Sequence, residues 1–235
     1  MSFQIKYFLS HLVQLLPYLG TTFLVMILSL FFGLILATLT AAANLGKNRI
    51  LRAIARGYIT LMRCVPPIVL LFVVYYGSPY LVYWMFKVNI NDWDSIYFAV
   101  FSLCLLYGAS LAEMMRGAYL SVDKGQREAA VSIGLSPFQA FYRIVFPQAL
   151  VTALPVLGNT VVSLLKDGAL AYSIGVVDVT GRAAYLISMN LGGYVLETYL
   201  ALALIYWVLS LITQKLFGIL ESKLQKGRVK VSHAT

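Results

Sequence analysis

Hydrophobic positions along the chain form long runs that are separated by short segments carrying the charges. Five runs lack Lys, Arg, Asp and Glu and are long enough to cross about 30 Å of hydrocarbon as a helix of about 20 residues. They lie at residues 22–43, between Arg63 and Lys87, between Asp94 and Glu113, between Arg143 and Lys166 with a weaker extension to Val177, and between Glu197 and Lys215. The pattern predicts an all-α integral membrane protein with five transmembrane helices.

The composition excludes a water-soluble surface. Of the 235 residues, 60% are hydrophobic and 11% are charged, whereas soluble domains carry about 25% charged residues. The length allows one compact unit and indicates no second domain.

The basic residues predict the direction in which the chain crosses the membrane. Short loops rich in Lys and Arg stay in the cytoplasm. The basic residues cluster at 47–63, 116–143 and 215–230, and the opposite loops hold only Lys6, Lys87 and Arg182. We therefore expect the N-terminus outside and the C-terminus in the cytoplasm. The net charge of +9 is then a consequence of topology and argues against a nucleic-acid partner.

The two ends of the chain differ in character. Residues 1–17 place Phe and Leu at helical spacing, which predicts a short helix at the outer membrane interface or, equally, an extension of the first span. Ala41–Ala43 resembles a signal-peptide cleavage site. However, the apolar run before it is too long for the hydrophobic region of a signal peptide, and the positive cluster follows this run instead of preceding it. We expect an uncleaved permease domain over 18–221 and a disordered basic tail over 222–235.

The segment between the third and fourth runs predicts a helical hairpin. Residues Arg127–Ile133 suit one short helix, and Gly134 supplies a left-handed C-terminal stop. Ser136 is placed to cap a second helix, with Pro137 in its first turn and Gln139 completing a capping box. This hairpin lies on the side of the basic loops.

The hairpin also carries a family motif. Glu128, Ala129, Ala130, Gly134, Ile144 and Pro147 have a spacing that resembles the EAA loop of ABC importer permeases. The resemblance implies that residues 124–147 form a coupling helix that inserts into a cleft of an ATPase subunit. Small alanines next to a glutamate suit close approach by another protein, although an ordinary surface hairpin is the alternative.

Three further segments are similar to polar amino acid permeases, namely Leu61–Pro67, Glu113–Gln126 and Ser163–Leu170. The chain departs from that pattern at Cys64, Val65, Gly168 and Ala169, which weakens any inference about the substrate. Within the family the resemblance leans toward cystine permeases of Gram-positive bacteria.

The resemblance implies a type I permease core that works as a dimer, with a second copy or a sister permease, around a central path. A solute-binding protein would deliver a polar L-amino acid from outside, and a cytoplasmic ATPase dimer would bind ATP and magnesium. We expect no cofactor in this chain, which has no GxxxxGK[ST] phosphate loop.

Lys166 and Asp167 follow the fourth apolar run and are expected at bilayer depth, where charged groups are costly. Nearby residues predict an interrupted helix, which suits substrate binding: Pro155, Gly158, Gly168 and Gly175. We hypothesise that Ser163, Lys166 and Asp167 line the passage, with Lys166 meeting a carboxylate and Asp167 an ammonium group. A structural ion pair is the alternative.

Other ionisable and sulfur-bearing residues predict little chemistry. Glu113 and Arg116 are three residues apart, which favours an ion pair within one helix over a gate or an ATPase contact. Cys64 and Cys104 lie in apolar stretches, so both are predicted to be buried.

Two other classes of function find no support. A secondary transporter or channel predicts inverted repeats or several ionisable groups within spans, and neither is apparent. His11 and His233 lie at opposite ends, and no Ser/His, Cys/His or HExxH arrangement indicates a membrane enzyme.

Overall fold

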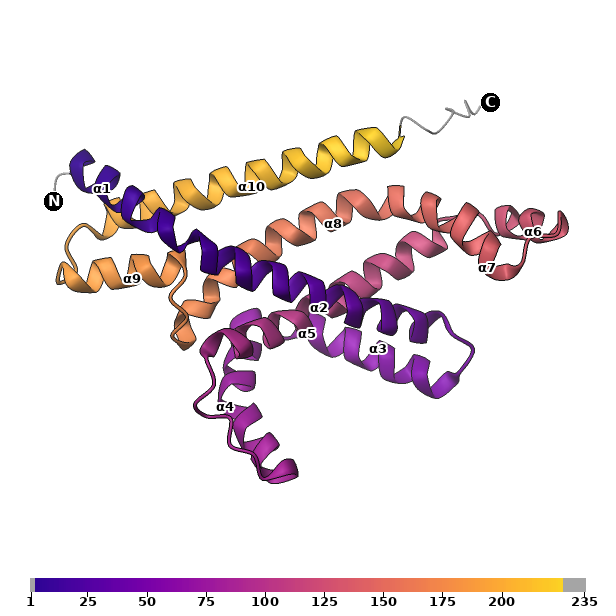
Figure 1. Cartoon of the computed structure of the whole chain (residues 1–235), viewed down its shortest axis with the longest axis horizontal. Coiled ribbons are helices and arrows are strands. Elements are labelled where there is room, and N and C mark those ends of the chain that lie inside the picture. Colours follow the sequence, from indigo (N-terminus) through magenta and orange to yellow (C-terminus); the bar gives the residue numbers. More distant parts are fainter. Residues whose placement is uncertain (1–2, 226–235) are drawn as a thin grey trace.

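The computed structural model describes residues 3–225, and this part of the chain consists of helices without a strand (Figure 1). The helices are α1 (Ile5–Leu15), η1 (Leu16–Tyr18), α2 (Leu19–Leu45), α3 (Arg49–Cys64), α4 (Pro67–Phe86), α5 (Ser95–Leu120), α6 (Lys124–Ser132), α7 (Pro137–Ala140), η2 (Phe141–Val145), α8 (Phe146–Gly168), η3 (Ala169–Ile174), α9 (Val179–Met189) and α10 (Val195–Gln225). Most of the predicted basic tail, together with His233, lies outside the described residues.

Five helical segments are long and apolar enough to cross a membrane, as predicted. They are Ile5–Leu45, Pro67–Phe86, Ser95–Leu120, Pro137–Ile174 and Val195–Leu224. Each contains one of the five charge-free runs or most of it. The second helix, Pro67–Phe86, is slightly shorter than its run, whereas others exceed theirs because they continue through charged residues, as α5 does through Glu113 and α10 through Lys215.

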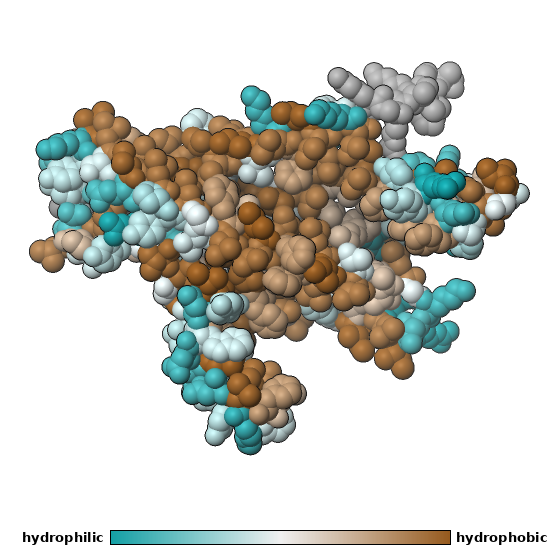
Figure 2. All heavy atoms as spheres, viewed as in Figure 1, coloured by the Kyte–Doolittle hydropathy of each residue, from teal (hydrophilic) through white to brown (hydrophobic). Residues whose placement is uncertain are grey.

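Polar segments lie at the two ends of the molecule and around the α4–α5 link, which projects from its side (Figures 1 and 2). Figure 1 shows the α2–α3 turn, the α6–α7 hairpin and the end of α10 at the right-hand end, and the N-terminus with α9 at the left. A broad hydrophobic belt separates the hydrophilic ends (Figure 2). The described parts of the three basic segments that were predicted to share one side of the membrane therefore lie toward one end of the molecule.

Helix α5 forms the centre of the bundle and packs against α2, α3, α4 and α8. Its inward residues Ala99, Ala109 and Ala112 are completely buried. A Cβ atom on Gly33 of α2 would lie only 3.7 Å from the backbone nitrogen of Gly108. Small residues let membrane helices approach closely in this way, where van der Waals packing drives association.

The basic segment 47–63, for which sequence analysis specified no secondary structure, is mostly helical. Asn48 caps α3 because its side chain accepts hydrogen bonds from the amides of Ile50 and Leu51. Ala55 and Ile59 are buried, and the Tyr58 hydroxyl donates to the Leu105 carbonyl of α5 at 2.6 Å. This helix therefore belongs to the bundle, and its C-terminal end reaches α5.

One prediction about the cysteines is confirmed and the other is wrong. Cys104 is buried in α5, but Cys64 is exposed. Cys64 is the last residue of α3 and precedes the extended link at Val65 and Pro66. Its side chain therefore lies outside the contact that α3 makes with its neighbours.

Helix α1 continues through η1 into α2 and packs on α9 and α10. Leu15 is completely buried in a cluster with Val179 and Leu202. His11 Nδ1 lies 2.8 Å from the hydroxyl oxygen of Thr198. The helix predicted within residues 1–17 is thus present, and its position at the membrane surface stays a prediction.

A buried carboxylate links α9 to the first span. Asp178 is 2% exposed and accepts hydrogen bonds from the Gly181 amide at 2.8 Å and from the Thr22 hydroxyl at 3.4 Å. The Thr22 hydroxyl oxygen also accepts from the Val179 amide at 3.3 Å. Burial raises the pKa of Asp178 to about 6, and the hydrogen bonds oppose that rise.

This carboxylate predicts a pH-dependent stability. The folded chain keeps the Asp178 proton to a higher pH than the unfolded chain, whose pKa is about 4. Its contribution is therefore fully present below pH 4 and is lost as the pH rises through 6, by up to about 3 kcal/mol. Asp178→Asn should flatten this part of the profile of detergent-purified protein, measured as melting temperature from pH 4 to 8.

The control for that profile is Asp92→Asn, which removes a carboxylate that is exposed. It should keep the wild-type slope because it leaves the buried Asp178 carboxyl in place. Identical slopes in wild type and Asp178→Asn would contradict the role assigned to burial.

Candidate coupling hairpin and transmembrane cavity

The predicted helical hairpin is present between α5 and α8. Asp123 caps α6 by accepting a hydrogen bond from the Gly125 amide at 2.6 Å. Gly134 ends the first arm with φ at +91°, a conformation in which a residue with a Cβ atom is strained. The turn between the arms therefore depends on this glycine.

The second arm begins with the predicted capping box. The Ser136 hydroxyl accepts from the Gln139 amide at 3.2 Å, and the Gln139 side chain accepts from the Ser136 amide at 2.9 Å. Helix α7 is only four residues long, and the π-helical segment η2 joins it directly to α8. The second arm of the hairpin is therefore continuous with the fourth span through helical backbone.

A ladder of aromatic rings runs along this second arm. The ring centroids of Phe138 and Tyr142 are 6.4 Å apart, and those of Tyr142 and Phe146 are 6.0 Å apart, with nearly parallel planes. Stacked rings of this kind stabilise the arm. The ladder continues from α7 across η2 to the first residue of α8.

The motif residues occupy three different positions in the hairpin. Glu128 and Ala129 are exposed on α6, whereas Ala130 is buried between the arms. Gly134 forms the turn, and Ile144 and Pro147 lie at the junction of η2 with α8. The apolar side chains of Ile133 and Phe138 are 81% and 75% exposed, so the tip of the hairpin is unusually apolar for a polar end of the molecule.

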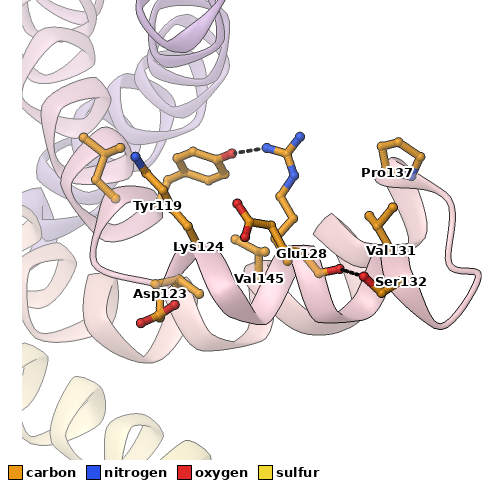
Figure 3. A pocket seen from close by; sticks show the side chains of 11 residues that line it. Tyr119, Asp123, Lys124, Glu128, Val131, Ser132, Pro137 and Val145 are labelled. Atoms are coloured by element: carbon orange, nitrogen blue, oxygen red, sulfur yellow. Dashed lines mark hydrogen bonds between the residues drawn. The ribbon is translucent and has the colours of Figure 1, made fainter.

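A hollow of about 630 Å³ lies between the two arms and the end of α5. Glu128, Val131 and Lys124 line it from α6, and Val145 lines it from η2 (Figure 3). The Arg127 guanidinium donates to the Tyr119 hydroxyl at 3.1 Å and ties α6 to α5.

A second cavity, of about 400 Å³, lies between α3, the start of α4, α5 and α8. Its polar lining includes Arg63 from α3, Ser110 from α5, and Asn159, Ser163 and Asp167 from α8. The residues of α8 are four apart, so they lie one above another on a single helix face.

Asp167 is held in this cavity by a neighbouring helix. Its Oδ2 atom accepts a hydrogen bond from the Tyr107 hydroxyl of α5 at 2.8 Å. Lys166 is exposed and does not line the cavity, since adjacent helical residues point about 100° apart. No ion pair joins Lys166 to Asp167, in contrast to Glu113 and Arg116 on α5, which do form one.

The predicted interruption of the fourth helix is displaced. Helix α8 runs unbroken through Pro155, Lys166 and Asp167 and ends at Gly168. The 3₁₀ segment η3 follows, and Gly175 ends it with φ at +94°. Asp167 therefore sits in the last turn of a regular helix, and the irregular backbone lies beyond it.

Arg63 and Asn159 also line this cavity, although neither was predicted there from the sequence. Arg63 was assigned to a cytoplasmic segment, but α3 carries it back toward α5. Asn159 was assigned no role, although its spacing from Ser163 and Asp167 is that of one helix face. That periodicity is the signal that would have identified it.

The ion pair predicted within one helix is confirmed. Arg116 donates from Nε to Glu113 Oε2 at 2.9 Å and from Nη2 to Glu113 Oε1 at 2.6 Å. Two parallel hydrogen bonds fix both side chains near the basic end of α5. No group of three His, Cys, Asp or Glu side chains in the described chain could hold a metal ion.

A family model matches these helices from span one to the end of α10. It is the model for binding-protein-dependent transport system inner membrane components, and it matches residues 29–226. The chain belongs to this family. It is therefore a multi-pass permease subunit of a bacterial inner-membrane importer and not an enzyme, because in these importers a separate subunit is the ATPase.

Two relatives from Bacillus subtilis (strain 168) align over most of their length. The chain is 41% identical over 217 residues to the L-cystine transport system permease protein TcyL, covering 92% of this chain and 90% of TcyL. It is 40% identical over 218 residues to the probable amino-acid permease protein YxeN, covering 92% of each.

Solved structures agree with the fold. A crystal structure of an amino acid ABC transporter with histidines superposes with a TM-score of 0.81 at 27% identity, covering 95% of this chain and all of that chain. An inward-facing structure of the MetNI methionine ABC transporter gives 0.65 at 19% identity, covering 95% and 99%. The five-span core with its hairpin is thus the fold of an ABC importer permease.

Proposed function

We propose that this permease imports a polar L-amino acid, with L-cystine as the first candidate. The similarity to TcyL over nearly the whole chain supports cystine, and the structural match to an amino acid ABC transporter supports the wider class. The chain would form half of the translocation path, with a second copy or a sister permease forming the other half.

The observation that carries this proposal is the pair of opposite charges in the cavity beside α5. Arg63 and Asp167 enter it from different helices. A zwitterion has a carboxylate for a guanidinium and an ammonium group for a carboxylate. Ser163 and Asn159 offer hydrogen bonds between the two charged ends, and Asp167 keeps the role expected from the sequence.

The α6–α7 hairpin is proposed to dock into a cytoplasmic ATPase dimer, which would bind ATP and magnesium. Glu128 and the apolar tip are exposed, and an exposed apolar patch at a polar end is typical of a protein contact. Docking there places the basic end in the cytoplasm and the N-terminus outside, where a solute-binding protein would deliver the substrate.

The transport cycle follows from these contacts. ATP binding closes the ATPase dimer and moves the docked hairpins. Because η2 joins the hairpin to α8 without a loop, α8 moves with it and carries Asp167 and Ser163. The cavity then opens alternately to the two sides of the membrane.

The proposal predicts ATP-dependent uptake of labelled L-cystine. Proteoliposomes should contain the permease and its ATPase. ATP is supplied on the side of the membrane where the ATPase lies, and the solute-binding protein is supplied on the other side. Uptake should require all three proteins and should be reduced by unlabelled cystine more than by a sugar. Robust uptake that an ion gradient drives without the ATPase would refute the proposal.

Within that assay, Asp167→Asn should lower the apparent affinity for the amino acid by about tenfold, because a charged partner of the ammonium group is lost. Lys166→Met should have a smaller effect, since Lys166 lies outside the cavity. Retention of the ATPase on purification controls for folding. Unchanged affinity and rate in Asp167→Asn would remove Asp167 from the passage.

Glu128→Gln should reduce coupled ATP hydrolysis and uptake by about tenfold, because an interfacial charge loses its partner. Substrate binding by the detergent-purified permease should be unchanged. The matched control is Asp92→Asn, which also removes one exposed carboxylate but at the opposite side of the membrane. Equal activity of the two variants would mean that Glu128 does not contact the ATPase.

A further inference from the structure

An apolar groove of about 600 Å³ runs along the basic half of the bundle, between α2, α5 and the η2–α8 junction. Leu34 and Leu45 mark its two ends on α2, and Met115, Phe146 and Ala153 line it from the other elements. We call it the α2–α8 groove. It is separate from the cavity that holds Asp167.

The lining of the α2–α8 groove is poor in polar groups. It has two side-chain hydroxyls, on Thr38 and Tyr119. The Thr38 hydroxyl donates to the Leu34 carbonyl at 2.8 Å, and the Tyr119 hydroxyl accepts from Arg127 at 3.1 Å, so each already has one partner. Neither hydroxyl carries a charge that could replace the hydration of a zwitterionic substrate, and the lining therefore favours an apolar occupant along this length.

The length of the groove equals one leaflet of a bilayer. Leu34 and Leu45 are eleven residues apart on a continuous helix, which is about 16 Å at 1.5 Å per residue. Half of the hydrocarbon thickness is about 15 Å. An acyl chain that starts at the basic end of the groove would thus end near the middle of the membrane.

Basic side chains lie where the headgroup of such a lipid would be. The groove ends at Gly46, and the exposed side chains of Lys47 and Arg49 follow immediately. Arg52 donates to the Gly46 carbonyl and holds α3 beside this end. Figure 2 shows the hydrophilic α2–α3 turn bordering the hydrophobic belt. Clusters of this kind attract anionic phospholipids.

We propose that the α2–α8 groove binds one acyl chain of an anionic phospholipid, with Lys47 and Arg49 holding its phosphate. A second copy of the permease is a poorer occupant. Copies related by an axis along the membrane normal meet at equal depth, so the same cations would face each other across the contact.

The α2–α8 groove adjoins the link between the hairpin and α8. Phe141 and Phe146, which line the groove, bracket the π-helical link between the hairpin and α8. A bound chain therefore packs against the segment that carries motion into the fourth span. Anionic lipid should therefore bind to the assembled transporter and also raise its rate of ATP hydrolysis.

The test is native mass spectrometry of the delipidated transporter complex after addition of phosphatidylglycerol or phosphatidylcholine. Lys47→Gln with Arg49→Gln should weaken phosphatidylglycerol retention by about tenfold and leave phosphatidylcholine retention unchanged. Ala42→Phe, which fills the groove from α2, should reduce retention of both lipids and abolish the stimulation of ATP hydrolysis by phosphatidylglycerol.

The matched control is Leu39→Phe, which adds a ring to an exposed position on α2 outside the groove. It should retain lipid like the wild type. Unchanged retention in Ala42→Phe would overturn the proposal. So would a disulfide between two copies carrying Ala42→Cys, because that result would place a second permease over the groove.

Discussion

A charged group inside a bilayer has no water to bind, and this constraint governs the ionisable side chains of the spans. Glu113 and Arg116 neutralise each other through two hydrogen bonds on one helix. Asp167, near the far end of α8, instead accepts from Tyr107 of α5. This hydroxyl uses one acceptor position of the Asp167 side chain and leaves others available, as the proposed contact with an ammonium group requires.

The surrounding lipid also explains why small residues lie where the helices of the bundle approach each other most closely. Hydrophobic burial gives little advantage between helices that are surrounded by lipid, so close packing must supply the attraction. Gly33 and Gly108 allow α2 and α5 to approach, and Gly158 does the same for α8 and α10, where an added Cβ would lie 2.9 Å from Phe217. The helices are thus locked near the axis of the bundle, while the cavity and the α2–α8 groove remain open beside it.

Features that depend on neighbouring residues could be predicted from the sequence. The spans follow from hydropathy over about 20 residues, and the hairpin follows from the turn and cap residues Gly134, Ser136 and Gln139. Both depend on interactions within a few turns, and the structure contains them as expected. The exposed side chain of Cys64 was predicted wrongly because hydropathy reports the class of a segment and not the face on which one residue lies.

Features that depend on distant contacts could not be predicted in this way. Arg63 reaches the cavity only because α3 packs back on α2 and α5, and charge counting alone places it in a loop. Lys166 and Asp167 were both expected to line the passage, but adjacent helical residues point about 100° apart, and only Asp167 of the two lines the cavity. Helical periodicity alone distinguishes these two residues, whereas the position of Arg63 required the tertiary structure.

The position of Pro147 connects the hairpin motif to mechanics. Proline has no amide hydrogen, so the carbonyl of Arg143 receives no helical bond from position 147. The chain takes π-helical geometry just before it, and the Phe146 amide donates to the Phe141 carbonyl. The Gln148 side chain donates to the Ile144 carbonyl at 3.0 Å and satisfies a further acceptor of this segment.

A link with altered hydrogen bonding is easier to bend than a regular α-helix, while the stacked rings of the aromatic ladder hold the second arm together. The junction can therefore change its angle without unfolding, as a segment must if it transmits movement from the hairpin to α8.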